Sequence, residues 1–212
     1  MTGQSGVGTE FDVLHELAAR RRDVRRFRKD NVEDDILDEI FQLVELSPSV
    51  GNSEPWRWVR VDNQEVRKEI QVHFEASNRS ARSAVPDEKK ALYDGLKLEG
   101  LKEAPVQFAV FCDPCTTQGS GLGRQTMPAT LHYSVACAIM SFWLGAKAKG
   151  LGVGWVSILE PAKVSALLDV PEQWDLIAYL CVGYPVEEHY DPELERLGWQ
   201  KRAWSRKNII SR

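Results

Sequence analysis

Apolar residues in the first half of the chain recur every three or four positions, which is the spacing of one face of an α-helix. Phe11, Leu14 and Leu17 show this spacing after Thr9, a residue that can cap a helix. The dense apolar run at 106–111 instead predicts a buried strand. The pattern predicts helices over residues 9–20, 33–46, 64–77, 87–102, 129–149 and 161–168, and strands over 57–62, 106–111, 150–159 and 176–182.

The segment 129–149 is apolar around most of the circumference of a helix about 30 Å long at ~1.5 Å per residue. Such a helix is usually buried on several sides, which favours a place between its own sheet and a partner subunit; a monomeric α/β core is the alternative. Helices alternate with short strands without regular strand–helix–strand crossovers. We therefore expect an α+β fold, with a central mixed or antiparallel sheet flanked by helices and a long central helix at a dimer interface.

The chain has 212 residues, which suits one domain. Residues 1–8 are expected to form a disordered tail, and residues 9–212 a single domain whose segment 186–212 is a polar C-terminal extension. Residues 113–128 have no apolar period and contain three glycines, so we expect a lid loop over a site there.

The formal net charge of −4 argues against a general nucleic-acid-binding protein, although seven of the ten residues from 20 to 29 are basic. No apolar run reaches the roughly 20 residues that a membrane-spanning helix needs. The four cysteines do not indicate a disulfide scaffold, and Cys112 and Cys115 lack the second ligand pair of a zinc site. We expect a cytoplasmic protein without a metal site.

A run of five arginines between residues 20 and 26 encloses one carboxylate, Asp23. Arginine side chains bind phosphate through two parallel hydrogen bonds, so the run indicates a site for a phosphorylated ligand whose reactive part lies near Asp23. A solvated basic surface is the alternative.

Three separated motifs complete the pattern: the arginine run, the small and rigid loop at 47–56, and the glycine-rich strand at 150–155. In this order they resemble the flavin-binding nitroreductase family over nearly the whole chain. Asp23 stands where most members carry serine. Together with the block 152–159 and the segments 96–100 and 124–128, it is similar to one branch of that family.

The resemblance implies FMN as the ligand and assigns roles to individual residues. Arginine side chains would hold the phosphate and ribityl chain, and these are Arg21, Arg22, Arg25 and, as a further candidate, Arg202. The isoalloxazine ring would lie against Pro48, Ser49, Asn52 and Pro55 at one edge and along the backbone of Gly152, Val153 and Gly154. Asp23 and Ser157 match the residues to which the chemistry of the branch is attributed. A positioned carboxylate can move protons, and a hydroxyl can orient a reacting group.

The same resemblance implies an activity: oxygen-dependent fragmentation of reduced FMN to 5,6-dimethylbenzimidazole and D-erythrose 4-phosphate, for cobalamin biosynthesis. FMN would then be a substrate, supplied in its reduced form by a separate flavin reductase, and the protein would be a homodimer. The alternatives are an NAD(P)H-dependent nitroreductase or flavin reductase that keeps FMN intact, and a flavin carrier without turnover. One physical question stays open at this point. Neighbouring arginines lower the pKa of Asp23, and burial raises it.

Overall fold

The computed structural model describes residues 8–203 and 209–212. Most of the predicted tail at 1–8 therefore lies outside the described residues. The helices are α1 (Glu10–Arg20), α2 (Asp34–Glu45), α3 (Gln64–Ser83), α4 (Asp87–Asp94), α5 (Thr130–Ala148), α6 (Pro161–Leu167) and α7 (Glu193–Arg196), with 3₁₀ turns η1 (Val50–Asn52) and η2 (Gln118–Gly121). The strands are β1 (Trp56–Arg60), β2 (Val106–Cys112), β3 (Gly152–Val156) and β4 (Asp175–Gly183).

The four strands form one sheet in the order β1-β2-β4-β3, and every neighbouring pair is antiparallel. Strand β2 is buried along its whole length because both of its faces are covered. Val106, Phe108 and Val110 face one hydrophobic core, whereas Ala109 and Phe111 face the other. This alternation is the period of a strand sandwiched between two layers of helices.

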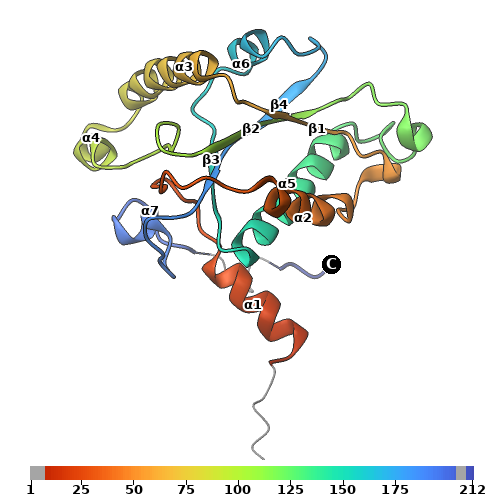
Figure 1. Cartoon of the computed structure of the whole chain (residues 1–212), viewed down its shortest axis with the longest axis horizontal. Helices are drawn as coiled ribbons and strands as arrows, with labels where there is room; N and C mark the ends of the chain where they lie inside the picture. The colour runs from red at the N-terminus through yellow and green to blue at the C-terminus, as the bar shows by residue number, and fades with distance from the viewer. Residues whose placement is uncertain (1–7, 204–208) are drawn as a thin grey trace, which may run out of the picture.

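Helices α2 and α5 cover one face of the sheet, and α3 and α6 cover the other (Figure 1). The α+β fold with an antiparallel sheet is therefore confirmed. In the single chain, Tyr133, Cys137 and Met140 of α5 are exposed along one stripe, and the predicted burial of this helix against a partner subunit stays a prediction. The part of α5 that meets its own sheet includes the fully buried Ile139 and Phe142.

Several boundaries differ from the sequence prediction for local reasons. The helix expected over 87–102 ends at Asp94, where Gly95 forms its C-cap. Helix α3 runs six residues beyond its predicted end, and the bidentate ion pair between Arg82 and Asp94 holds its last turn against the end of α4. The strand expected over 150–159 is shortened to five residues. In the described part of the segment 186–212 the chain forms a helical turn, α7, which was not predicted.

The segment 113–128 packs against the loop 47–55. Gln118 Nε2 donates to the carbonyl oxygen of Asn52 at 3.0 Å, and Arg124 Nη1 donates to the carbonyl oxygen of Thr116 at 2.8 Å. Whether this segment closes over a ligand stays a prediction.

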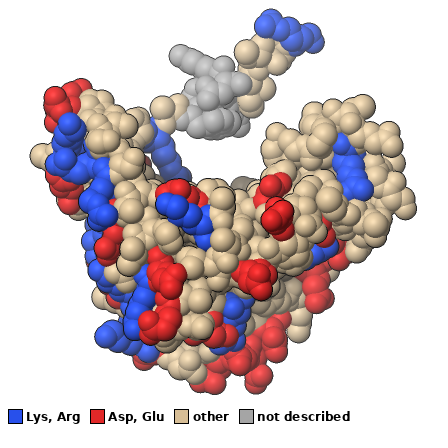
Figure 2. Space-filling view, turned by 90° about the horizontal axis from the view of Figure 1, so that it is seen from above, with Lys and Arg blue, Asp and Glu red and all other residues tan. Residues whose placement is uncertain are grey.

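Acidic and basic side chains are interspersed over much of the face shown in Figure 2. Helix by helix, the described part of the chain offers no span that is long and apolar enough to cross a membrane.

Candidate functional site

The arginine run lies on the free edge of the sheet. Strand β3 is an outer strand, and its unpaired edge is occupied by Asp23 and Val24 in a short parallel bridge. The Val24 backbone N–H donates to the carbonyl oxygen of Val153 at 3.0 Å. An edge strand exposes backbone donors and acceptors that need partners, and this segment supplies them. The run is thereby held on the sheet as an ordered structure.

The glycines of β3 make this contact possible. A Cβ atom on Gly152 would lie 2.6 Å from Cγ2 of Val24, and one on Gly154 would fall on the Val24 carbonyl oxygen. The sequence analysis expects a flat ligand to lie along these glycines. The structure adds another explanation, since the missing side chains leave room for the arginine run. Contact of this strand with a flavin stays a prediction.

Both oxygens of the Asp23 carboxylate are engaged. Oδ1 accepts a hydrogen bond from the Trp155 backbone N–H at 2.8 Å, and Oδ2 accepts one from Nη2 of Arg25 at 2.8 Å. Burial raises the pKa of Asp23 above its usual value, against the opposing effects of Arg25, the Trp155 N–H and Arg21. Of the two opposing effects on Asp23, burial is therefore the larger.

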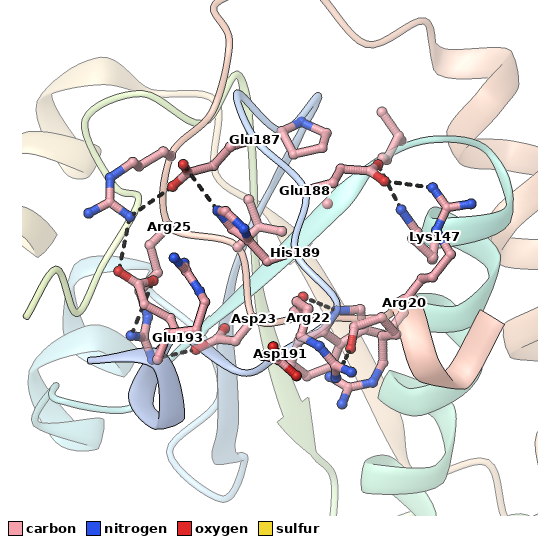
Figure 3. Close-up of a pocket in the computed structure, with 18 residues that line it drawn as sticks. Arg20, Arg22, Asp23, Arg25, Lys147, Glu187, Glu188, His189, Asp191 and Glu193 are labelled. Carbon is pink, nitrogen blue, oxygen red and sulfur yellow. Dashed lines mark hydrogen bonds and ion pairs between the residues drawn. The ribbon is translucent and has the colours of Figure 1, made fainter. Parts of the chain in front are cut away.

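The arginine run forms the floor of a pocket whose other walls come from distant parts of the chain (Figure 3). The C-terminal half of α5 contributes Trp143 and Lys147. The segment 185–191 and α7 close the opposite side. Lys147 and Arg20 both bind Glu188 of that segment, at 2.7 and 2.8 Å. Lys147, Glu188 and Glu193 were missed by sequence reasoning, although the acidic character of 187–193 offered a signal of charge complementarity with the arginine run.

The arginines of the run have different immediate partners. The guanidinium of Arg21 lies 4.6 Å from the centre of the Trp143 ring, and no described residue forms a hydrogen bond or ion pair with it. Arg22 donates to the backbone carbonyls of Ala19, Arg21 and Tyr190. Burial lowers the pKa of both Arg21 and Arg22, and the nearby charge of Arg202 lowers it further. Three positive charges therefore lie near one another: Arg21 and Arg22 line the pocket, and Arg202 is close to both without lining it.

Arg25 differs from these three arginines, because its nearest acceptors are carboxylates. Its Nη2 binds Asp23, and its Nη1 lies 3.8 Å from Oε2 of Glu193. A contact between Arg25 and a phosphate stays a prediction.

The loop at 47–55 lies elsewhere on α5, at the N-terminal half of the helix. The Val50 N–H donates to Oγ of Ser134 at 3.0 Å, and the Glu54 N–H donates to Oγ of Ser49 at 3.1 Å. Gly51, Asn52 and Glu54 all have positive φ, so the loop has a specific and strained shape. Pro48 and Ser49 line a small pocket with Tyr133, Ser134 and Cys137, whereas Pro55 is buried. No described residue lines both this pocket and the arginine pocket.

Ser157 directly follows β3 and is exposed. It lies two positions beyond Trp155, whose N–H binds Asp23, so both predicted catalytic residues lie along the same edge of the sheet. Two residues span about 6.6 Å in a strand. Ser157 is absent from the described lining of the arginine pocket. Its participation in catalysis stays a prediction.

Two features bear on metal or redox chemistry. Among the described residues there is no cluster of three or more His, Cys, Asp or Glu side chains that could hold a metal ion. Burial raises the pKa of the Cys112 thiol to about 11, which makes it a poor nucleophile at neutral pH.

A comparison with protein families matches residues 18–184 to the nitroreductase family. The chain belongs to the nitroreductase family. It is 55% identical over 191 residues to the 5,6-dimethylbenzimidazole synthase of Rhodospirillum rubrum, covering 90% of each protein. It is 43% identical over 202 residues to the enzyme of the same name from Rhodobacter capsulatus, covering 94% of this chain and 98% of the relative. These matches confirm the resemblance identified from the three sequence motifs.

Two solved structures with bound FMN have the same fold. One is an oxidised iodotyrosine deiodinase bound to FMN and 3-iodo-L-tyrosine, with a TM-score of 0.71 and 26% identity, covering 94% of this chain and 97% of the other. Another is a nitroreductase with bound FMN from Desulfitobacterium hafniense, with a TM-score of 0.65 and 18% identity, covering 94% and 97%.

Proposed function

We propose that this protein fragments reduced FMN with oxygen to 5,6-dimethylbenzimidazole and D-erythrose 4-phosphate, for the lower ligand of cobalamin. The observation that carries the proposal is a partly buried carboxylate, Asp23. It is held by two hydrogen bonds beside a cluster of arginines, in a chain 55% identical to a 5,6-dimethylbenzimidazole synthase. Reduced FMN would supply both the electrons for oxygen and the carbon atoms of the product.

The pocket fits a phosphate group. Arg21 has no described anionic partner, and its charge adds to those of Arg22 and Arg202. Converging guanidinium groups repel one another, and a bound dianion relieves that repulsion. Charge-assisted hydrogen bonds contribute roughly 1.5–3 kcal/mol each, so three arginines are sufficient for tight binding of a mononucleotide. Arg21, Arg22 and Arg202 would therefore hold the phosphate.

Asp23 would accept and return protons at its Oδ atoms during the fragmentation. Its two hydrogen bonds fix the carboxylate, and its raised pKa makes it a better proton acceptor than a solvated aspartate. Ser157 would orient a reacting group through its hydroxyl from the same strand edge. The flavin ring would lie along this edge, against the backbone of 152–154.

A homodimer is part of the proposal. Helix α5 carries the arginine pocket on its C-terminal half and the 47–55 loop on its N-terminal half, and Tyr133, Cys137 and Met140 form an exposed stripe between them. An antiparallel pair of α5 helices around a two-fold axis buries this stripe and brings the loop of one subunit to the arginine pocket of the other. Pro48, Ser49, Asn52 and Pro55 would then reach the flavin bound by the partner.

We also propose a cytoplasmic location, since the four cysteines are all unpaired and a separate flavin reductase would have to supply reduced FMN.

The test is to mix the protein with chemically reduced FMN in aerated buffer and to identify products by chromatography and mass spectrometry. We expect 5,6-dimethylbenzimidazole from the native protein and at least a hundredfold less from Asp23→Asn and Ser157→Gly. Asp30→Asn is the matched control, because Asp30 is an exposed aspartate that pairs with Arg28 outside the pocket.

Recovery of intact, reoxidised FMN would refute the proposal. Reduction of bound FMN by NADH or NADPH would then indicate a nitroreductase or flavin reductase. If neither nicotinamide reduces the bound flavin, a carrier is indicated.

A further inference from the structure

The Asp23 carboxylate is the first member of a chain of ion pairs that ends on α7, some 170 residues later in the sequence (Figure 3). Arg25 binds Asp23 through Nη2 at 2.8 Å and faces Oε2 of Glu193 with Nη1 at 3.8 Å. The other oxygen of Glu193 accepts a hydrogen bond from Nη1 of Arg26 at 3.0 Å. Charges of alternating sign thus run from the sheet edge to the C-terminal segment.

The middle of this chain is shielded from water. The side chains of Arg25 and Glu193 are 11% and 13% exposed, whereas that of Asp23 is 32% exposed. Nη1 of Arg25 is buried and has no hydrogen-bond partner in the described chain, since 3.8 Å is too long for a hydrogen bond. Charges in such surroundings influence one another more strongly than charges on the surface.

A carboxylate held by arginines is ordinarily a weak proton acceptor, because the positive charges stabilise its ionised form. Glu193 places a negative charge on the far side of the Arg25 guanidinium. The positive charge of Arg25 is then divided between two carboxylates, and its pull on Asp23 is reduced. The isolated helical turn that carries Glu193 has no buried residue of its own, so packing alone does not explain a shielded glutamate there.

We propose that Glu193 is a positioning residue that acts through Arg25 to keep Asp23 able to accept a proton. The proposal deepens the proposed function and rests on it. It also gives Arg25 a role that does not require contact with the phosphate.

Other charged groups face this chain of ion pairs. Arg21 lies close enough to Asp23 to lower its pKa. From β4, Cys181 is near Asp23, but burial raises the pKa of its thiol and keeps it neutral. Arg26 also binds Glu187 at 3.3 Å. None of these groups contacts both Arg25 and Asp23. Glu193→Gln therefore removes the charge that faces Arg25 and Arg26, and it leaves the Arg25–Asp23 and Arg26–Glu187 pairs in place.

The experiment follows the protonation of Asp23 directly. In protein labelled with carbon-13 at the aspartate carboxyl groups, the Asp23 resonance is assigned by its loss in Asp23→Asn and titrated in the flavin-free protein. We expect Glu193→Gln to lower the pKa of Asp23 by about half a unit to one unit. Glu195→Gln removes the same charge from the same helical turn and is the matched control, expected to leave the titration unchanged. Glu193→Asp withdraws the carboxylate from Arg25 and is expected to give a smaller shift of the same sign.

Two further readouts separate positioning from binding. The dissociation constant of FMN should stay within twofold of the native value in Glu193→Gln, while the rate of product formation at its pH plateau falls about two- to threefold. The acid limb of the rate profile should move to lower pH by the amount seen in the titration.

An unchanged or raised pKa of Asp23 in both Glu193→Gln and Glu193→Asp overturns the proposal, as does an equal shift in Glu195→Gln. If the native protein makes no product from reduced FMN, the proposed function fails. The titration still decides whether Glu193 controls Asp23, so the two failures are distinguishable.

Discussion

Substitution of Gly154 by alanine tests the central structural argument, that the glycines of β3 exist to let the arginine run lie on the sheet edge. The new Cβ would fall on the carbonyl oxygen of Val24. Because both groups belong to the backbone or are attached directly to it, no side-chain rotation relieves the clash. The run must move away from β3, and the Val24–Val153 hydrogen bond and the Asp23–Trp155 hydrogen bond are lost with it.

The expected cost follows from these two bonds. A neutral hydrogen bond contributes about 1 kcal/mol and one to a charged group about 1.5–3 kcal/mol, so Gly154→Ala should lower the free energy of unfolding by about 2.5–4 kcal/mol. Arg21 and Arg22 move with the run, so the affinity for FMN should fall at least a hundredfold. Urea denaturation measures the first effect and flavin fluorescence titration the second.

Gly95→Ala is the control, because Gly95 has a φ of −82° and a Cβ there makes only an ordinary contact at 3.5 Å. A loss below about 1 kcal/mol in Gly154→Ala, with FMN affinity unchanged, would refute the reasoning.

Three other predictions use the same structure. Arg21→Gln should weaken FMN binding roughly 10- to 100-fold while riboflavin, which lacks the phosphate, binds as before; equal losses for both ligands in a titration would contradict a phosphate role. Arg25→Gln removes a group that lowers the pKa of Asp23, so that pKa should rise. As the pH is lowered, activity that needs the ionised carboxylate should then be lost at a higher pH than in the native protein. A rate profile whose acid limb stays in place or moves to lower pH would argue against the pairing. Phe142→Ala should lower the free energy of unfolding by about 3–5 kcal/mol, because the side chain is fully buried among Phe41, Trp58 and Phe108. Urea denaturation measures this change. A loss under about 1 kcal/mol would show that the core collapses around the cavity.

The elements of the fold could be predicted where the sequence pattern is local. The apolar period of 129–149 and the apolar run at 106–111 identify α5 and β2 almost to the residue, since each depends on a single periodicity. The end of α4 was missed because Gly95 lies inside an otherwise helical pattern, where a glycine can either be tolerated or form a cap. Tertiary contacts decide whether such a glycine is tolerated or ends the helix, and a sequence pattern does not contain these contacts.

The site was predictable only in part, because it too depends on contacts between residues far apart in the sequence. Asp23 was identified because its neighbours in sequence are unusual. Glu193 was missed because its significance lies in a contact with Arg25 across 168 positions. The reason for Gly152 and Gly154 was likewise hidden, since Val24 meets them only after the run has folded onto β3. Residue types and spacing indicate the chemistry of a site, and long-range packing determines which charges face one another.

The structure also explains how one sequence segment can serve two opposed requirements. A phosphate site needs several positive charges, whereas a proton acceptor beside it loses basicity with each of them. The bridge to β3 separates the two functions in space, since it turns Arg21 toward Trp143 and α5 and fixes Asp23 against the Trp155 N–H. Arg25 is the arginine that is hydrogen-bonded to the carboxylate, and Glu193 faces Arg25 from the other side. Arg25→Gln should therefore act mainly on proton transfer, and Arg21→Gln mainly on the affinity for FMN.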